Sequence, residues 1–456
     1  MPGRELRKEP LLLSWREIVA LIESVKKAEE IKPAQQAKRD VFKKYGFLGG
    51  RKDPPLTAIF YRVLLRQGIL DKVIKEITGV NNVLLLDPYL RAAMRVFAEL
   101  EIYSRREFRY LNPKEVRRRI SAYLSARSHP YVGMWFWDIL GELRAHKLVP
   151  RSEEDELMLK YLLPAWYVKK IISLIGRDEA EKYFKSLNRR PKISVRVNRL
   201  KADTEEVILA LKAEGKKVER SKVVETVLRF EGPYNFTKSR LYREGKIIIQ
   251  EEAAALAVHL LNPKPGHVVV DLAAAPGGKT ELIGELMENK GVIHAYDIDR
   301  KRIKRMEELL RRAGVDNVVI HVSDGRNAPR ELGKGIADRV LVDAPCSSDG
   351  TLMKNPDLRW RLMEKEVPKF AQLQYELLKA GLKLLKPGGL MLYSTCSMLR
   401  EEDEDVVERL LNHESSKVEL IPLRGPYNPG FLEGTMRAWP HKHETIGFFY
   451  ALFRRR

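Results

Sequence analysis

The stretch from His267 to Thr280, HVVVDLAAAPGGKT, decides the fold of this 456-residue chain. An apolar run that suits a buried strand ends at Asp271, and a turn of small residues with two adjacent glycines leads into a helix beginning near Thr280. Glycine and alanine let a ligand approach the backbone, and the free N–H groups at a helix start favour a polar or anionic group. The stretch therefore predicts a strand, a ligand-binding turn and a helix.

Three further strands are predicted downstream, and each leads to an aspartate. Residues 292–296 lead to Asp297, residues 318–322 to Asp324, and the apolar run 340–342 to Asp343. Ligands of open parallel sheets bind outside the carboxyl ends of the strands, so these acids and Asp271 are expected to line one edge. An acid at the end of the second strand is the usual partner of a ribose diol, which favours that role for Asp297. Helix capping and surface ion pairs are the alternatives, together with stabilisation of the turn for Asp271.

Strands and helices continue to alternate towards the end of the chain. Apolar positions at helical spacing predict a helix near residues 364–385, which stops at the cluster Lys386-Pro387-Gly388-Gly389 before a fifth strand. An acid-started helix follows over residues 401–411, and because its acids suit the positive end of the helix dipole we assign them no catalytic role. Strands near residues 418–422 and 447–453 complete a pattern typical of the α/β class.

The chain contains two cysteines, and each comes directly after a predicted strand. Cys346 lies in DAPCSSDG (residues 343–350), and Cys396 lies in STCS (residues 394–397). Inert core residues or a single disulfide are the alternative interpretations, because buried cysteine commonly behaves as a small hydrophobic residue. Since the neighbouring motifs indicate a ligand site, we favour thiols that are kept for chemistry.

Four motifs together suggest a family. The combination of DLAAAPGGKT, DAPCSSDG, STCS and the closing PHKHETIGFFYAL resembles the Nop/Sun (Fmu-like) family of S-adenosylmethionine-dependent RNA cytosine-5 methyltransferases. The resemblance covers roughly residues 160–456 and includes a run from Tyr183 to Asn198 that is similar to the family's small RNA-binding subdomain. The chain departs from the pattern at Ala273, where bacterial members often carry cysteine, and at Ser348-Asp349, which bears on fine substrate fit.

The resemblance implies an α/β chain of three parts. Residues 251–456 would form a Rossmann-like methyltransferase fold with a mostly parallel seven-stranded sheet, and residues 151–250 a linker with a small α+β RNA-binding subdomain. Residues 1–150 are similar to the NusB-like RNA-binding domain of bacterial members that act on ribosomal RNA, and we place the boundary near residues 147–156. Helical spacing in this first part covers segments 15–27, 57–67, 73–78, 88–100 and 114–124, with turns at Gly46, Gly49-Gly50, Pro54-Pro55 and Asn112-Pro113.

Methylation at carbon 5 of cytosine calls for a thiol whatever the family. This carbon is a poor nucleophile, but addition of a thiolate at carbon 6 makes it enamine-like and divides one hard step into easier ones. Release then requires removal of the carbon 5 proton, which is a general-base task at a second position. The resemblance implies that Cys396 is the nucleophile, that Cys346 assists release, that Asp343 bonds the cytosine edge and that Lys279 lines the pocket.

The cofactor that the resemblance implies is S-adenosylmethionine. Asp297, Arg302 and Asp324 would hold its ribose and adenine ends, with the exposed face of a surface helix as the alternative for Arg302. The residues expected to bind the cofactor are Ala274, Ala275, Pro276, Gly277, Gly278, Lys279, Thr280, Asp297, Arg302, Asp324 and Asp343.

The composition agrees with RNA as a partner. The chain carries 83 Lys+Arg against 62 Asp+Glu, a net charge of +21, and residues 1–150 alone hold 29 Lys+Arg against 17 Asp+Glu. Phosphate backbones attract such surfaces without reading sequence, although a solvated, charge-rich surface is the alternative. The helical first part favours ribosomal RNA over transfer RNA as the substrate.

Three other functions fit parts of the pattern. A DNA cytosine-5 methyltransferase would attack with the Pro-Cys cysteine and would not need Cys396. An exocyclic-amine methyltransferase would carry an Asn/Asp-Pro-Pro-aromatic motif after the fourth strand, where this chain has Asp343-Ala344-Pro345-Cys346. A non-catalytic RNA-binding or ribosome-assembly protein would not need both thiols and all the strand-end acids.

The chain is expected to be a soluble, cytoplasmic monomer. No signal peptide and no apolar run of about eighteen residues is evident. The free thiols suit a reducing compartment. The cysteines and histidines show no zinc spacing, so we expect no metal and no membrane partner.

Overall fold

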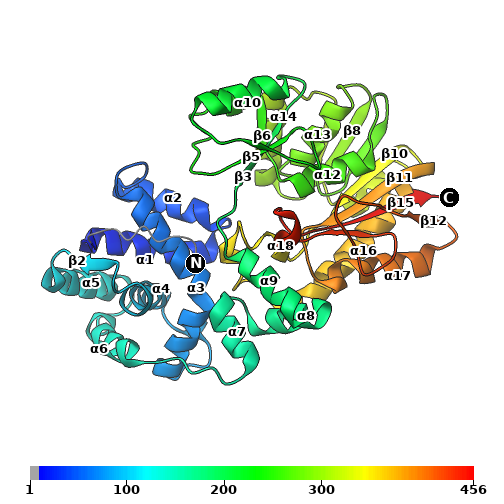
Figure 1. Ribbon diagram of the computed structural model, residues 1–456. Helices are drawn as coiled ribbons and strands as arrows, with labels where there is room; N and C mark the ends of the chain where they lie inside the picture. Colours follow the sequence, from blue (N-terminus) through cyan, green and yellow to red (C-terminus); the bar gives the residue numbers. More distant parts are fainter. Residues whose placement is uncertain (1–9) are drawn as a thin grey trace. The chain divides into compact units, whose positions relative to one another are not determined.

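The computed structural model describes residues 10–456, which divide into two compact units whose elements are labelled in Figure 1. The helical unit comprises the residues up to Lys169 together with the short segment Asn355–Arg361. The sheet unit comprises Lys170–Lys354 and Leu362–Arg456. Helix α7 (Glu153–Tyr161) belongs to the helical unit, where Asp155 forms an ion pair with Lys72 at an N–O distance of 2.9 Å.

The helical unit is a bundle with one small strand pair. Strand β1 (Leu11–Leu13) pairs in parallel with β2 (Phe108–Tyr110), so the part predicted to be all-helical contains two strands of three residues each. Its other helices are α1 (Trp15–Glu30), α2 (Ala34–Tyr45), α3 (Asp53–Thr78), α4 (Pro88–Ala98), α5 (Pro113–Arg127) and α6 (Val132–Ala145), with short helical turns at η1 (Val83–Leu85), η2 (Glu99–Tyr103) and η5 (Pro356–Leu358). Helix α8 (Ala165–Ile175) runs across the border between the two units.

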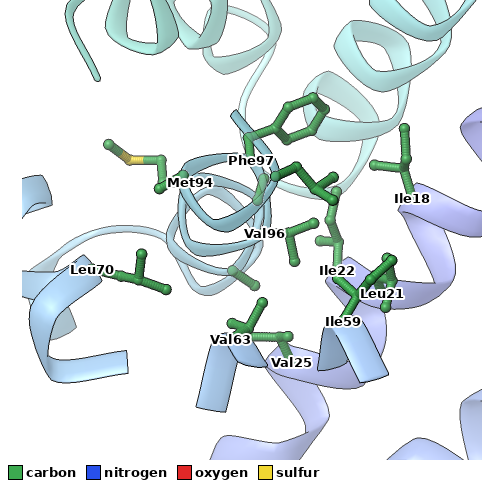
Figure 2. Close-up of a cluster of buried hydrophobic side chains, with 14 of the residues drawn as sticks. Ile18, Leu21, Ile22, Val25, Ile59, Val63, Leu70, Met94, Val96 and Phe97 are labelled. Atoms are coloured by element: carbon green, nitrogen blue, oxygen red, sulfur yellow. The ribbon is translucent and has the colours of Figure 1, made fainter. Parts of the chain in front are cut away.

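The core of the helical unit consists of aliphatic and aromatic side chains from helices α1–α6. Figure 2 shows Ile18 and Ile22 of α1, Val63 of α3 and Phe97 of α4 converging on one another. The ring of Phe97 also meets Phe136 of α6 edge to face, with 5.0 Å between centroids. Full burial of a side chain of this size contributes about 1.5–3 kcal/mol, so this cluster is the main source of the unit's stability.

A segment distant in sequence completes the helical unit. Residues 355–361 lie between the two cysteine motifs, yet Trp360 donates a hydrogen bond from Nε1 to the carbonyl of Leu65 in α3 at 2.9 Å. A Cβ atom on Gly68 would lie 2.0 Å from the Trp360 ring, so only glycine leaves room for this indole. Arg361 donates to the carbonyl of Ala28 at the end of α1.

The sheet unit is built on a nine-stranded sheet. Its central strands run β9-β8-β7-β10-β11 with parallel neighbours, and β15 joins β11 in antiparallel orientation. The strands are β7 (Val268–Asp271), β8 (Val292–Asp297), β9 (Val318–Val322), β10 (Ala337–Asp343), β11 (Leu385–Thr395), β12 (Val418–Ile421), β13 (Asn428–Pro429), β14 (Met436–Ala438) and β15 (Phe448–Arg455). Seven strands match the prediction, and the short strands β13 and β14 extend the sheet beyond β15.

Helices cover both faces of this sheet, as Figure 1 shows. Val340 and Val342 of β10 pack with α16 and α17, whereas Leu341 between them packs with α12 and α13, as strand alternation requires. The helices are α12 (Glu252–Leu261), α13 (Gly278–Leu286), α14 (Arg300–Ala313), α15 (Ala328–Glu331), α16 (Val367–Leu384), α17 (Glu404–Glu414) and α18 (Pro440–His443), with short turns η3 (Gly325–Asn327), η4 (Asp349–Thr351), η6 (Glu364–Glu366) and η7 (Arg400–Glu402). The order in which strands are added to the sheet reverses at β7, since β8 and β9 lie on one side of it and β10 and β11 on the other, and such folds bind ligands at this point.

A small antiparallel sheet precedes the main one within the sheet unit. Its strands β3 (Ile193–Val197), β4 (Glu219–Arg220), β5 (Val227–Phe230) and β6 (Ile247–Ile249) follow the order β4-β5-β3-β6, accompanied by helices α9 (Arg177–Leu187), α10 (Thr204–Ala213) and α11 (Arg240–Arg243). Arg196 of β3 is fully buried and forms ion pairs with Glu281 and Glu285 of α13. This buried contact fixes the small sheet to the helix that follows the predicted ligand turn.

Most of the predicted elements of residues 251–456 are confirmed within a few residues. Two predictions for the first part were wrong. Pro54 and Pro55, which were predicted to form a turn, lie in the first turn of α3. Segments 57–67 and 73–78, which were predicted separately, belong to that single helix. Proline is favoured at such positions because its missing N–H has no helical partner there. None of the helices in residues 10–456 is both long and apolar enough to cross a membrane.

Candidate active site

The two cysteines lie side by side at the carboxyl edge of the sheet. Strands β10 and β11 are parallel neighbours with Asp343 opposite Ser394, which brings the loops that follow them together. The two sulfur atoms are 3.3 Å apart, and both thiols are free and partly exposed. The amide of Gly350 donates to the carbonyl of Cys396 at 2.9 Å and closes the two loops on one another.

The contact between the sulfurs separates the acidities of the two thiols. A hydrogen bond from Cys346 lowers the pKa of Cys396, and the positive charge of Lys279 acts in the same direction. The same hydrogen bond, together with burial, raises the pKa of Cys346 well above its ordinary value. Cys396 is therefore the more acidic of the two thiols and Cys346 the less acidic.

A lysine–aspartate pair lies next to the thiols. Lys279 Nζ is 2.6 Å from Asp343 Oδ2, and the other oxygen of Asp343 accepts a hydrogen bond from Ser394 Oγ at 3.0 Å. The ammonium also lies 5.2 Å from the centre of the Phe448 ring. Lys279 lies in the first turn of α13 and Asp343 ends β10, so the segment after β7 contributes directly to the surroundings of the thiols.

Two contacts fix the turn between β7 and α13. Gly277 has a φ of +100°, and a Cβ atom there would lie 2.5 Å from the side chain of Met306, so glycine is required at this position. Asp271 is buried and accepts a hydrogen bond from Thr280 Oγ at 2.8 Å, and burial raises its pKa to about 7. These are the contacts of a residue that stabilises the turn.

Asp297 joins the ends of β7 and β8. It is 5% exposed, and its carboxylate accepts hydrogen bonds from the amides of Ala275 at 3.1 Å and of Asp299 at 2.9 Å. Arg302 lies 3.4 Å from the same carboxylate and donates to the carbonyl of Ala275. The following residue, Ile298, is 73% exposed, and its apolar side chain next to an acid is a feature that the sequence interpretation missed.

Asp324 lies at the end of β9 but has a local partner. Its oxygens accept hydrogen bonds from the amide and the guanidinium of Arg326, which also lower its pKa. This arrangement includes both alternatives considered for the strand-end acids, since Asp324 caps η3 and forms an ion pair. The structure thus brings Cys346, Cys396, Lys279 and Asp343 together, and it places Asp297 and Arg302 around the ligand turn.

Near the two thiols lies a group of buried acids, three of which belong to the run that the sequence analysis assigned to the start of a helix without a catalytic role. Glu402, Asp403 and Glu404 have no exposed surface, and neither has Asp349. Arg437 of β14 pairs with Asp403 and Glu404. From sequence alone, a buried run of acids looks the same as the solvated start of a helix. The difference here is the partner Arg437, which is 33 residues from Glu404.

Comparisons with known proteins agree on one family. The family model described as 16S rRNA methyltransferase RsmB/F matches residues 258–454, and an RsmF/B-like ferredoxin-like domain model matches residues 163–237. The probable ribosomal RNA small subunit methyltransferase B of Bacillus subtilis (strain 168) is 32% identical over 298 residues, which are 64% of this chain and 66% of that protein. The protein of the same description from Synechocystis sp. is 30% identical over 411 residues, 87% of this chain and 89% of that protein.

Solved structures extend the likeness to the whole chain. The crystal structure of PH0851 is 49% identical, with a TM-score of 0.89 over 98% of this chain and 100% of that one. The crystal structure of NSun6 from Pyrococcus horikoshii with SFG is 27% identical, with a TM-score of 0.60 over 64% of this chain and 98% of that one.

The fold and the strand-end site define a methyltransferase that uses S-adenosylmethionine. The residues present suit this cofactor, because Asp297 offers a carboxylate for a diol and Ile298 an exposed apolar surface for a flat ring. More narrowly, the chain belongs to the RsmB/F family of 16S rRNA methyltransferases, which confirms its resemblance to the Nop/Sun group.

Proposed function

We propose that this protein methylates carbon 5 of a cytosine in small-subunit ribosomal RNA through a covalent bond between Cys396 and carbon 6. The observation that carries the proposal is the 3.3 Å contact between two free thiols next to the Lys279–Asp343 pair. Two thiols this close can reach the same base, which a mechanism with one thiol for attack and another for release requires.

The electrostatics supports a division of labour between the thiols. Cys396, whose pKa is lowered, adds as a thiolate to carbon 6, and Asp343 accepts a hydrogen bond from the base edge that gains a proton. Carbon 5 then takes the methyl group that S-adenosylmethionine supplies when it is bound. Once Cys396 is bonded to carbon, it no longer raises the pKa of Cys346, so Cys346 can lose its proton and act as a base. Removal of the carbon 5 proton re-forms the ring double bond and expels the Cys396 thiolate.

The residues proposed to hold the cofactor surround the turn after β7. The turn Ala274–Thr280 ends at the start of α13, where the first N–H groups have no partner within the helix. Asp297 has lone pairs left for the ribose hydroxyls, and Ile298 is proposed to pack against the adenine ring. Arg302 is proposed to hold the turn through its hydrogen bond to the carbonyl of Ala275. Asp324 is proposed to contact the cofactor after its ion pair with Arg326 has opened.

Ribosomal RNA is proposed as the substrate because the relatives are described as ribosomal RNA small subunit methyltransferases. Exposed aromatic rings of the helical unit also support binding of RNA by that unit. Tyr131 and Trp135 at the start of α6 are 57% and 62% exposed, and their rings are stacked with 6.3 Å between centroids. Stacked exposed rings are the usual platform for unpaired bases.

The experiment that tests the mechanism compares two alanine variants incubated with substrate RNA and S-adenosylmethionine. Cys396→Ala cannot form the bond to carbon 6 and should show neither methylation nor adduct. Cys346→Ala should methylate once and then stall, giving a protein–RNA adduct on a denaturing gel that depends on both substrates. The opposite pattern would assign attack to Cys346, and no adduct with either variant would exclude covalent catalysis.

The substrate is tested separately from the mechanism. Bisulfite sequencing of total RNA from a deletion strain should show the loss of one 5-methylcytosine in small-subunit ribosomal RNA. Loss at a transfer RNA position instead would contradict the proposed substrate while leaving the chemistry intact.

A further inference from the structure

One buried carboxylate connects the two cysteine loops. Glu402 in η7 has no exposed surface, and its carboxylate accepts hydrogen bonds from the amide of Ser347 at 2.9 Å and from Ser397 Oγ at 3.1 Å. Each of these serines directly follows one of the cysteines. A single side chain thus holds the residue next to Cys346 and the residue next to Cys396.

Neighbouring groups share the same task. Gln374 of α16 donates from Nε2 to Glu402 at 3.0 Å and to the carbonyl of Pro345 at 2.9 Å, so it connects Glu402 to the residue before Cys346. Asp349 accepts hydrogen bonds from Ser347 Oγ at 2.9 Å and from the amide of Met398 at 3.0 Å. The Oγ atoms of Ser347 and Ser397 are themselves 3.2 Å apart.

The charge of Glu402 acts on the thiols as well. Burial, followed by the negative charge of Asp349, raises the pKa of Glu402 to about 7, while its hydrogen bonds with Ser347 and Gln374 oppose the shift. Glu402 in turn contributes to the raised pKa of Cys346, after the hydrogen bond with Cys396 and burial. The titratable and charged groups around Glu402 are Cys346 and Asp349 in the first loop, Tyr393 of β11, Asp403 and Glu404 of its own segment, and Arg437 of β14.

The net charge close to Glu402 is therefore negative on the side of the thiols. Arg437 forms buried ion pairs with Asp403 and Glu404, and it has no hydrogen bond to Glu402 among the described contacts. Glu402 is held instead by neutral donors: an amide, a hydroxyl and a carboxamide. Its charge is thus left to act on Cys346.

We propose that Glu402 is a positioning residue for the methyl transfer: its carboxylate, hydrogen-bonded to the residue after each cysteine, holds loops 344–350 and 396–399 in register and lies next to the Cys346 loop. This inference rests on the proposed function for its consequence in catalysis, but the arrangement of the thiols can be tested without RNA or cofactor. Because the chain has only two cysteines, the reactivity of each can be followed in the intact protein.

The test measures the rate at which iodoacetamide alkylates each cysteine as a function of pH, with the two peptides separated by mass spectrometry. Glu402→Gln is close to isosteric, since its amide oxygen can accept from Ser347 and its amide nitrogen can donate to Ser397, but it carries no charge. Alkylation of Cys346 near pH 8 should rise about threefold to tenfold, because the thiolate fraction changes about tenfold for each pKa unit. The matched control is Glu401→Gln, because Glu401 pairs with Lys170 on the surface and should leave both profiles unchanged.

A second readout separates positioning from folding. Glu402→Ala removes the acceptor of the buried Ser347 amide as well as the charge, so kcat should fall further than in Glu402→Gln while the KM for S-adenosylmethionine stays within about twofold. Should Glu402→Ala fail to fold, Glu402→Gln decides alone. An unchanged Cys346 profile in Glu402→Gln would overturn the inference, and so would a loss confined to KM. A shifted profile in a protein whose wild type does not methylate cytosine would support the inference and refute the proposed function.

Discussion

At the scale of single residues, Asp297 is the acid of the ligand turn with the clearest consequence for cofactor binding. Losing a charge-assisted hydrogen bond costs about 1.5–3 kcal/mol. Asp297→Ala should therefore weaken S-adenosylmethionine binding about tenfold to a hundredfold at about 1.4 kcal/mol per decade, measured by calorimetry. Part of the loss arises from the turn, because Asp297 also accepts from the Ala275 amide.

Two further variants separate these contributions. Asp297→Asn keeps an acceptor for the turn but removes the charge, so its affinity should lie between those of the wild type and Asp297→Ala. Asp299→Asn is the matched control, since asparagine caps a helix as well as aspartate does and Asp299 only caps α14. Equal affinities for wild type and Asp297→Ala would remove this residue from the site.

The sequence alone predicted that the two cysteines lie close together, but it did not predict that Glu402 holds their loops. Cys346 and Cys396 each follow a strand, and adjacent parallel strands bring such positions together. Glu402 is 55 residues from the Ser347 amide that it binds, and nothing in a run of five acids reveals which of them is buried. The same limit applies to Ile298, because its exposure depends on the packing of the rest of the chain, which the local sequence does not reveal.

At the scale of elements, the least expected feature is the seven-residue segment that the sheet unit's sequence contributes to the helical unit. Its central contact is a fit between Trp360 and the glycine in the middle of α3. Gly68→Ala should destabilise the protein by about 1–3 kcal/mol, as overpacking usually does. Trp360→Ala should also destabilise it, by about 2 kcal/mol, because the indole is only half-buried.

The double variant gives the sharper test. Without the indole, alanine at position 68 no longer clashes and suits a helix better than glycine by about 1 kcal/mol. Gly68→Ala should therefore change from destabilising in the wild type to neutral or stabilising in Trp360→Ala, as measured by urea unfolding in a double-mutant cycle. Additive effects would show that the two residues do not share a contact in solution.

This contact also explains why a glycine lies inside the single helix α3, which the sequence analysis predicted as the separate segments 57–67 and 73–78. Glycine within a helix usually lowers its stability. The reason for Gly68 is the close approach of Trp360, a residue almost three hundred positions away in sequence, which no local pattern contains. Elements whose apolar faces pack locally, such as α16 and β8, were predicted almost to the residue.

At the scale of the whole molecule, the first part of the chain presents both exposed basic side chains and exposed aromatic rings. Helix α5 presents Arg117, Arg118 and Arg119 to solvent, and Arg117 lies 5.4 Å from the ring of Trp137 in α6. Gly133 lets α6 approach α5 closely, since a Cβ atom there would lie 2.3 Å from the carbonyl of Ser121. Proteins bind single-stranded RNA through a combination of basic side chains and exposed stacked rings, and α5 and α6 supply one of each.

Deleting residues 1–150 should weaken RNA binding and flatten its salt dependence, with little change in cofactor affinity. The structure makes substitution a cleaner test, because the helical unit extends to Lys169 and includes residues 355–361, so this deletion would leave Trp360 and α7 without their core partners.

The last prediction therefore concerns the stacked pair in the intact chain. Base–aromatic stacking is worth about 1–3 kcal/mol per base, so Tyr131→Ala with Trp135→Ala should weaken RNA binding at least about tenfold while leaving S-adenosylmethionine affinity unchanged. Because stacking involves no phosphate, the slope of affinity against salt should also stay unchanged, whereas Arg117→Ala with Arg118→Ala should reduce that slope. Met134→Ala, at a 68% exposed position on the same turn, is the control and should bind RNA normally. Full RNA affinity in the Tyr131/Trp135 variant would show that this platform serves a different partner, and a matching loss in Met134→Ala would attribute the effect to the fold of α6 rather than to its rings.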